Sequence, residues 1–528
     1  MGKAMAWRVF GRTGRTGRPG VARWARQRLV AMGVCAVAAV GTTLAAALLA
    51  PRDAGAQVPP DVRSGDLILM GGRLWDGTAD AARPNPGVFI RNGTILAVGG
   101  FPAEGPGDAP SVARTLAESR GARVLDLPAD AFVMPGLFDL HAHYAVDLFG
   151  QGRVDEYTVN PVLFLANGVT STFPAGEVDP DEARRGRARI ARGEIPGPRV
   201  YASGPYWGTW RTGWDEEAMT PDSLRKEATY WALQGARGFK AKGISYELLP
   251  TLIDVAHAHG ITVTGHLDTN RRGVNPRDAI LMGIDRVEHF LGGDAFLDDR
   301  SAYASLESLD LDDPATAEKI RAQARLFVEH GAYFNATMGA YGYWTVREAG
   351  LYDDWADERG FLTPYAREVV EAALPREPLP QFEKIHYVKK HTLKAFFDAG
   401  GGPWLTLGTD HPSWGEFWSG FGVHRELDAM VRAGVPNAWA LRAGTANAAR
   451  AFGEGARLGT IEPGKYADLY VVRGDPLTDI THTRNGLWVI RSGQVHRPDE
   501  LLASVRGRMG PDGPADAGWW KGRQRLGG

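Results

Sequence analysis

Six residues with metal-binding or proton-transferring side chains lie at or near the ends of short apolar runs in this sequence. His141 and His143 are two positions apart, so on a strand both imidazoles point the same way and can reach one ion. Nitrogen and oxygen donors of this kind suit Zn best, with Mn, Co, Ni and Fe as alternatives. The other four candidates are Lys240, His266, His289 and Asp410.

Each of these signals is weak alone, because a single histidine in an apolar strand is usually a core residue. The combination is strong, since four of the 13 histidines and two further polar residues end five different apolar runs. A purely structural role for all of them, or a catalytically silent barrel that only binds metal, remains the competing interpretation. We therefore interpret the set as one metal centre.

The elements that must position these residues are eight apolar runs, each followed by a stretch that permits a helix. Eight strands that alternate with helices predict a (β/α)8 TIM barrel, an α/β fold whose chemistry lies at the C-terminal ends of its strands. An open doubly wound sheet is the alternative, but no G-x-G-x-x-G motif follows an early strand. The runs are residues 131–144, 168–174, 198–204, 236–243, 260–267, 284–290, 331–338 and 403–410.

Both flanks of this middle region have the texture of short strands joined by Gly and Asn turns, which predicts a small antiparallel sheet. Two such flanks pair most simply with each other, as a composite β-sandwich domain. The predicted divisions are a leader (1–56), the N-terminal part of the β domain (57–130), the barrel (131–455), the C-terminal part of the β domain (456–510) and a tail (511–528).

The N-terminal segment is basic and is followed by an apolar run at residues 29–50 and by an Ala-Gly-Ala before Gln57, which predicts an export signal cleaved at that point. An uncleaved membrane anchor is the alternative, because the run is close to the ~20 residues that span a bilayer. Either way the body is expected to be periplasmic or extracellular. The only cysteine, Cys35, lies in this leader, so the mature chain offers no thiolate ligand.

The charge balance argues against nucleic acid as a partner. The formal net charge is −2, but residues 1–56 hold nine Lys and Arg against one acid. The remaining body, with 51 basic and 61 acidic residues, therefore carries −10. An acidic body gives no electrostatic basis for binding a phosphate backbone.

Ordered motifs along most of the chain resemble the amidohydrolase superfamily, and most closely its imidazolonepropionase-like and prolidase-like branch. The motifs are MPGLFDLHAH at 134–143, NGVT at 167–170, GPRVYASG at 197–204, GIDRVEH at 283–289, LGTD at 407–410, AGTANAAR at 443–450 and GTIEPGKYADL at 459–469. The resemblance implies that His141 and His143 hold a first metal, that His266 and His289 hold a second, and that a carboxylated Lys240 bridges them. It also implies that Asp410 binds the first metal, takes a proton from the attacking water and passes it to the leaving group. Lys242 faces the same side as Lys240 and is the alternative bridge; without carboxylation, one metal is the better expectation.

Residues in the loops beyond the strands are candidates for substrate binding. Tryptophans after the third, seventh and eighth strands could form an aromatic wall for a bulky apolar amide. Two arginines after the fifth strand could pair with a substrate carboxylate. His411 departs from the Gly-Thr-Asp-Ser pattern of this branch and leaves the specificity open. The candidates are Tyr201, Trp207, Arg271, Arg272, His411 and Trp414.

The resemblance and the metal-ligand pattern together predict an exported hydrolase that uses metal-activated hydroxide to cleave an amide or peptide-like C-N bond of a small molecule. Dipeptidases and N-acyl amino acid hydrolases are the expected classes. The alternative is a mononuclear enzyme for cyclic substrates, a deaminase or a lactonase. The resemblance also implies a homo-oligomer, and membrane association is expected only if the leader stays uncleaved.

Overall fold

The computed structural model describes residues 62–99, 114–115, 117–148, 152–267, 273–293, 305–306, 308–342, 350–351, 355–373, 380–412 and 419–516. The predicted leader and its cleavage point lie outside these residues. The chain divides into the units Met1–Asp53 and Ala54–Gly528, and every described residue belongs to the second. In the described ranges no helix is both long enough and apolar enough to cross a membrane.

Every one of the eight predicted apolar runs contains a strand, and these strands run parallel to their neighbours in two arcs. The first arc has the order β12-β11-β8 and the second the order β13-β14-β15-β16-β17-β18. Most of these strands are buried on both faces, as parallel strands covered by helices are. Their bounds are β8 (Leu137–Ala142), β11 (Val169–Pro174), β12 (Arg199–Val200), β13 (Tyr206–Trp207), β14 (Gly238–Lys242), β15 (Thr262–His266), β16 (Arg286–Glu288), β17 (Tyr333–Asn335) and β18 (Leu405–Thr406).

The predicted closed barrel is corrected to a TIM-barrel-like α/β fold, because the two arcs do not form one continuous hydrogen-bonded sheet. Backbone hydrogen bonds still join β8 to the chain around β18, from Leu140 N to Leu407 O (3.0 Å) and from Asp410 N to His141 O (2.8 Å). At the other gap β12 is only two residues long, too short to continue a ladder into β13.

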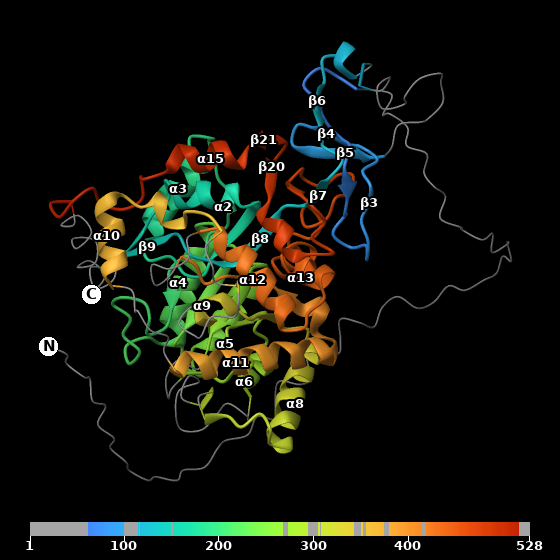
Figure 1. The fold of residues 1–528 in the computed structure, drawn as a ribbon. Helices are drawn as coiled ribbons and strands as arrows, with labels where there is room; N and C mark the ends of the chain where they lie inside the picture. Colours follow the sequence, from blue (N-terminus) through green and yellow to red (C-terminus); the bar gives the residue numbers. More distant parts are fainter. Residues whose placement is uncertain are drawn as a thin grey trace, which may run out of the picture. The chain divides into compact units, whose positions relative to one another are not determined.

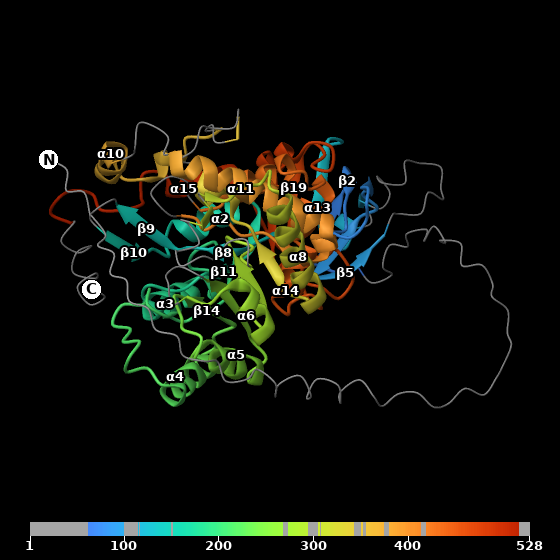
Figure 2. The same cartoon turned by 90° about the horizontal axis from the view of Figure 1, so that it is seen from below.

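Helices lie between successive strands, and α4, α5, α6 and α8 follow one another along the outside of the strands (Figure 2). Four of them begin at a capping Asp, Thr or Asn followed by proline, which satisfies the free amides of the first turn and presets φ. The helices are α2 (Asn160–Ala166), α3 (Pro180–Ala191), α4 (Pro221–Leu233), α5 (Leu249–Ala258), α6 (Pro276–Met282), α8 (Pro314–His330), α9 (Met338–Gly342), α10 (Pro364–Ala373), α11 (Pro380–Phe396), α12 (Phe421–Arg432), α13 (Asn437–Ala443), α14 (Ala446–Ala451) and α15 (Pro498–Val505). Short 3-10 or π turns are η1 (Glu358–Phe361), η2 (Phe397–Gly401), η3 (Gly402–Trp404) and η4 (Ile480–Arg484).

The first predicted run is divided at Gly136 into two strands of different sheets. A side chain at this glycine would collide with Thr170, since a Cβ would lie 2.3 Å from its Oγ1. The strand before it, β7, joins a six-stranded sheet of order β21-β20-β19-β7-β2-β3, so strands from both ends of the chain share one sheet (Figure 1). Its bounds are β2 (Arg73–Leu74), β3 (Arg83–Pro84), β7 (Ala131–Pro135), β19 (Leu469–Arg473), β20 (Gly486–Arg491) and β21 (Gln494–His496).

A second sheet, of order β5-β4-β1-β6, packs on the first through a shared apolar cluster that includes Leu69, Ile90, Val471 and Ile490. Both sheets are mixed rather than antiparallel as predicted, because β1 pairs with β6, and β2 with β7, in parallel. The boundaries of the predicted domains stay predictions. The strands are β1 (Leu67–Met70), β4 (Val88–Arg91), β5 (Thr94–Val98) and β6 (Arg123–Asp126), and a separate hairpin joins β9 (Ala145–Leu148) to β10 (Gly152–Asp155).

Candidate metal centre

The strand ends bring together all six residues that the sequence singled out. His141 lies on β8 with His143 one residue beyond it, Lys240 lies within β14, and His266 ends β15. His289 and Asp410 follow β16 and β18 directly or closely. Parallel strands end at one edge, so side chains far apart in the sequence meet there.

Asp410 is the common contact of the imidazoles. Its Oδ1 lies 3.0 Å from His141 Nε2 and 2.8 Å from His143 Nε2, and its Oδ2 lies 4.0 Å from His289 Nδ1. The His289 ring in turn lies 4.0 Å from that of His266, measured between centroids. Among the described residues, ligand atoms of His141, His289 and Asp410 lie within 4.8 Å of one another, a spacing that one metal ion can bridge.

Burial sets the charge of these groups. It lowers the pKa values of His141, His266 and His289 well below the usual range, so the imidazoles are neutral, which is the form that binds metals. Burial alone would raise the pKa of Asp410, but the adjacent His141 and the hydrogen bonds from His141 and His143 hold it well below its ordinary value. The cluster thus combines neutral nitrogen donors with a carboxylate.

Glu288 is a member of the cluster that the sequence analysis did not assign. Its carboxylate contacts Lys240 Nζ as an ion pair, accepts a hydrogen bond from Thr264 Oγ1 (2.7 Å) and lies 3.3 Å from His141 Nδ1. Lys240 Nζ also lies 3.5 Å from His141 Nε2. Glu288 therefore both neutralises an unmodified Lys240 and orients the His141 ring. The sequence feature that could have identified Glu288 is its position as a carboxylate within an apolar run, directly before His289.

Asp139 ties the two strands that carry the first ligands. Its carboxylate accepts hydrogen bonds from His141 N (3.0 Å), Thr409 N (3.1 Å) and Thr409 Oγ1 (2.6 Å). Burial raises its pKa to about 6. Gly408 allows the close approach, because a Cβ there would lie 2.6 Å from His141 Cβ and 2.1 Å from Asn335 Nδ2.

Three residues at this edge have left-handed backbones, which only constraint from the surroundings sustains for residues other than glycine: His289 (φ 67°), Thr337 (φ 45°) and Asp410 (φ 61°). Thr337 Oγ1 lies 2.7 Å from His289 Nδ1 and fixes the ring. Two buried side chains hold the adjoining turns, and the sequence analysis assigned neither.

The first of these side chains is Lys389 on α11, whose Nζ donates to the carbonyls of His289 (2.5 Å) and Ala336 (2.6 Å). The second is Glu426 on α12, which accepts from the amides of Met338 (2.9 Å) and Gly339 (2.8 Å). Burial lowers the pKa of Lys389 to about 7 and raises that of Glu426 to about 7. Both residues lie on helices, among apolar residues with a helical repeat. A single charged residue in such a repeat has no characteristic spacing that would mark it as functional.

The predicted substrate-binding residues are only partly brought to this cluster. His411 is buried next to Asp410, and burial lowers its pKa to about 4. Trp207 is wholly buried against Phe239 in the core instead of overhanging the mouth, because it lies on the strand β13 that the sequence did not predict. Tyr201 lies against Phe452, away from the histidines. Arg271, Arg272 and Trp414 fall outside the described residues.

Comparison with known proteins gives one family and a consistent fold. Residues 393–493, which include Asp410, match the Amidohydrolase family. No curated protein matches the chain. Among solved structures, a Xaa-Pro dipeptidase shares 20% identity, with 82% of this chain and 100% of that chain covered and a TM-score of 0.58.

Two further solved structures agree. Molinate hydrolase shares 20% identity over 86% of this chain and 99% of its own, with a TM-score of 0.60. The A. niger ochratoxinase shares 18% identity over 84% of this chain and 99% of its own, with a TM-score of 0.57. At these identities the likeness shows the fold. The motifs and the match over residues 393–493 make this chain similar to the Amidohydrolase family, and both agree with a hydrolytic enzyme acting on C-N bonds.

Proposed function

We propose that this chain is an exported, metal-dependent hydrolase that cleaves an amide or peptide-like C-N bond of a small molecule, with dipeptides and N-acyl amino acids as the substrate classes. The observation that carries the proposal is the convergence of His141, His143 and His289 on Asp410 at the end of the parallel strands. The name of the Xaa-Pro dipeptidase supports the same bond type.

The residues present fit a divalent cation. Four buried imidazoles, three with pKa values that keep them neutral, face a carboxylate held ionised. His141, His289 and Asp410, with His143 next to them, would hold one ion, and His266 offers a nitrogen donor for a second. When bound, a divalent ion here supplies Lewis acidity that activates water and polarises a carbonyl.

Asp410 is the residue that moves the proton. Its Oδ1 is engaged by two imidazoles, whereas Oδ2 lies 4.0 Å from the nearest nitrogen of His289. Its side chain keeps 17% of its surface exposed, so water can reach it. Because its pKa is low, it is ionised at neutral pH, can take a proton from the attacking water, and can then deliver it to the departing nitrogen.

A mononuclear enzyme for cyclic substrates, such as a deaminase or lactonase, is the second candidate. The ion pair between Lys240 and Glu288 favours it. A carboxylated Lys240 would place a second anion against Glu288, whereas the unmodified lysine leaves the pair neutral. A single ion on His141, His289 and Asp410 needs no bridging carbamate.

Elemental analysis of the full-length chain, purified with bicarbonate and without chelator, separates the candidates. Two ions per chain in the unmodified protein and in Lys242→Met, but one in Lys240→Met, would support the carbamate at Lys240. Amide substrates would then be screened. One ion in all three proteins would support the mononuclear enzyme and a screen of cyclic substrates. No ion after reconstitution, or no turnover of either substrate group, would overturn the proposal.

Export and self-association are parts of the proposal that separate measurements test. Secretion from an expression host should yield a chain that begins at Gln57. A chain beginning at Met1 in the membrane fraction would instead indicate an uncleaved anchor. Light scattering gives the oligomeric state, for which the family resemblance favours a homo-oligomer.

A further inference from the structure

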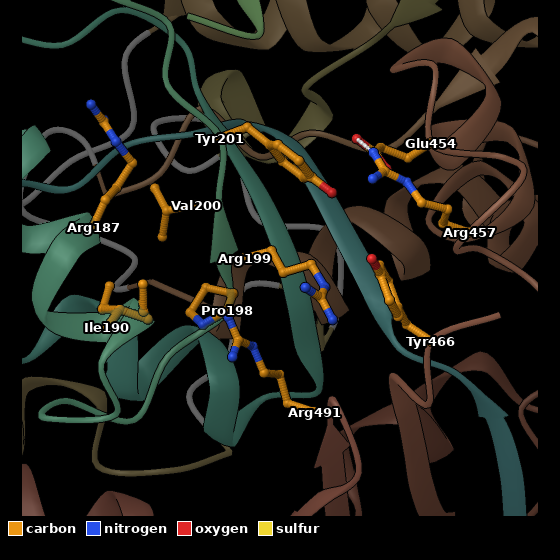
Figure 3. Close-up of a pocket in the computed structure, with 11 residues that line it drawn as sticks. Arg187, Ile190, Pro198, Arg199, Val200, Tyr201, Glu454, Arg457, Tyr466 and Arg491 are labelled. Carbon is orange, nitrogen blue, oxygen red and sulfur yellow. Dashed lines mark hydrogen bonds and ion pairs between the residues drawn. The ribbon is translucent and has the colours of Figure 1, made fainter. Parts of the chain in front are cut away.

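A cavity of about 290 Å³ lies where the start of β12 meets α3, the chain after α14 and the end of β20. Its walls include Tyr201, which the sequence analysis had placed with the substrate-binding residues of the metal centre. The cavity is lined by none of the six metal-centre residues. Figure 3 shows Tyr201, Arg199, Tyr466 and Arg491 around it. It is therefore a separate site, and the residues that line it determine what it can bind.

Positive charge dominates the walls. Arg187, Arg199, Arg457 and Arg491 line the cavity, and Glu454 is the acidic lining residue. The acids behind the wall neutralise only part of this charge. Glu177 contacts Arg187, and Asp468 binds Arg199 at 3.0 Å.

The one acidic lining residue is already shared. Glu454 accepts from Arg457 Nη2 at 2.6 Å and from a further arginine, Arg237, at 2.9 Å. Including that arginine, five guanidinium groups therefore face three carboxylates around the cavity, a local excess of two positive charges. This excess lies in a body whose net charge is −10.

Arg491 carries the excess most directly. Its Nε is buried and, among the described residues, has no hydrogen-bond partner. Its charge stands next to that of Arg199, which is already bound to Asp468 and to Ser492 Oγ. Burial and the charge of Arg199 lower the pKa of Arg491, an electrostatic cost that an anion in the cavity would relieve. Asp468 offsets part of this cost, but the Nε of Arg491 stays available. A guanidinium Nε together with a neighbouring Nη can bind a carboxylate or phosphate group in two places.

The remaining walls limit the ligand to a small molecule with a short apolar part. Ile190, Pro198 and Val200 supply apolar surface, and two tyrosines lie on the opposite wall. Burial raises the pKa of Tyr201, so its hydroxyl stays protonated and can donate to an anion. The ring of Tyr466 lies 4.4 Å from Arg199 Cζ and supports that guanidinium.

We propose that this cavity binds a small anion through Arg491 and Arg199, with a carboxylate or phosphate group as the recognised chemistry. The site is independent of the hydrolytic reaction, because none of its residues touches the metal centre. An anion bound there would connect β12 of the barrel-like arc to β20 of the six-stranded sheet.

Calorimetric titration of the full-length chain with inorganic phosphate and, separately, with succinate tests the proposal. Saturable binding of one or both anions is expected, and the pattern identifies the phosphate or the carboxylate as the preferred group. Arg491→Met is expected to weaken binding at least about tenfold. Arg473→Met is the matched control, because Arg473 lies on the neighbouring strand β19 and is paired with Asp130 outside the cavity.

Tyr201→Phe removes the hydroxyl that can donate to the anion but keeps the ring, and it tests the site if Arg491→Met does not fold. It should weaken binding about two- to fivefold if the hydroxyl donates to the anion. No saturable binding of either anion at about 10 mM would overturn the proposal, as would equal weakening in Arg491→Met and Arg473→Met. Hydrolytic activity is expected to be unchanged in Arg491→Met and Arg473→Met, which separates this test from that of the proposed function.

Discussion

The metal centre is a buried polar site and the arginine cavity a partly exposed one, and the two have opposite deficits of charge. At the metal centre, neutral imidazoles surround the carboxylates of Asp410 and Glu288, with Lys240 as the one cation in contact. In the cavity, guanidinium groups exceed carboxylates. Buried charge is costly unless it is compensated, so each site is expected to bind what it lacks, a cation in one and an anion in the other.

The two sites also differ in how they are held. The metal centre is fixed by strand ends and by left-handed backbones at His289 and Asp410, supported by buried hydrogen bonds from two helices. The cavity is formed by side chains from four segments, which are α3, β12 with its flanking residues, the chain after α14 and the end of β20. The rigid strand ends of the metal centre suit a reaction that requires fixed distances between the reacting groups. The long arginine side chains of the cavity suit the binding of a ligand.

The largest expected effect is the loss of activity in Asp410→Asn. The amide cannot accept the proton, so kcat should fall by about 10²- to 10⁴-fold on the best substrate, measured with saturating metal. Asp428→Asn is the control, because Asp428 is equally an aspartate in a buried ion pair, with Arg432 and Arg484, but lies outside the centre. Unchanged turnover in Asp410→Asn would remove the catalytic assignment.

The next effect concerns Glu288→Gln and tests the state of Lys240. If the lysine is unmodified, removing the carboxylate leaves a buried cation unpaired, and the free energy of unfolding should fall by about 3 kcal/mol. The measurement is denaturant unfolding of metal-free protein, with Glu358→Gln, which breaks the buried pair with Arg425, as the reference. Stabilisation by Glu288→Gln would mean that Lys240 is not a cation in the folded chain, either because it carries a carbamate or because burial, which lowers its pKa, keeps it neutral.

Much of the metal centre could be predicted because the pattern that marks it is local in the sequence. Polar residues that end apolar runs meet at the C-terminal edge of a parallel sheet, whatever the register of its strands. Glu288 lies in such a run, but its role could be recognised only from its contact with Lys240 in the structure. Lys389 lies 53 residues beyond Ala336 and Glu426 lies 87 residues beyond Gly339, the residues whose backbone they bind, and no spacing rule connects them. Tyr201 lines the arginine cavity, and its predicted role in substrate binding stays a prediction.

A smaller effect is the pH dependence of stability that Glu177 should cause next to the arginine cavity. Burial raises the pKa of Glu177, beside Arg187 and Asp155, to about 7 from the ordinary 4.5. The folded chain then binds this proton more tightly than the unfolded chain does, so its contribution to stability is lost as the pH rises from 4.5 to 7, by at most about 3 kcal/mol. Denaturant unfolding over this range should show a flatter slope in Glu177→Gln; an unchanged slope would contradict the raised pKa.

The smallest expected effect is that of Thr337→Val on metal affinity. The hydroxyl 2.7 Å from His289 Nδ1 orients this ring, and losing such an outer hydrogen bond typically weakens metal binding about tenfold. Competition with a chromogenic chelator measures the affinity, and Thr406→Val is the control, because its buried hydroxyl donates to Phe334 O away from the ligands. Equal affinities in both variants would show that the left-handed backbone at His289 alone orients the ring. Phosphate affinity in the arginine cavity should be the same in both, since neither hydroxyl lines it.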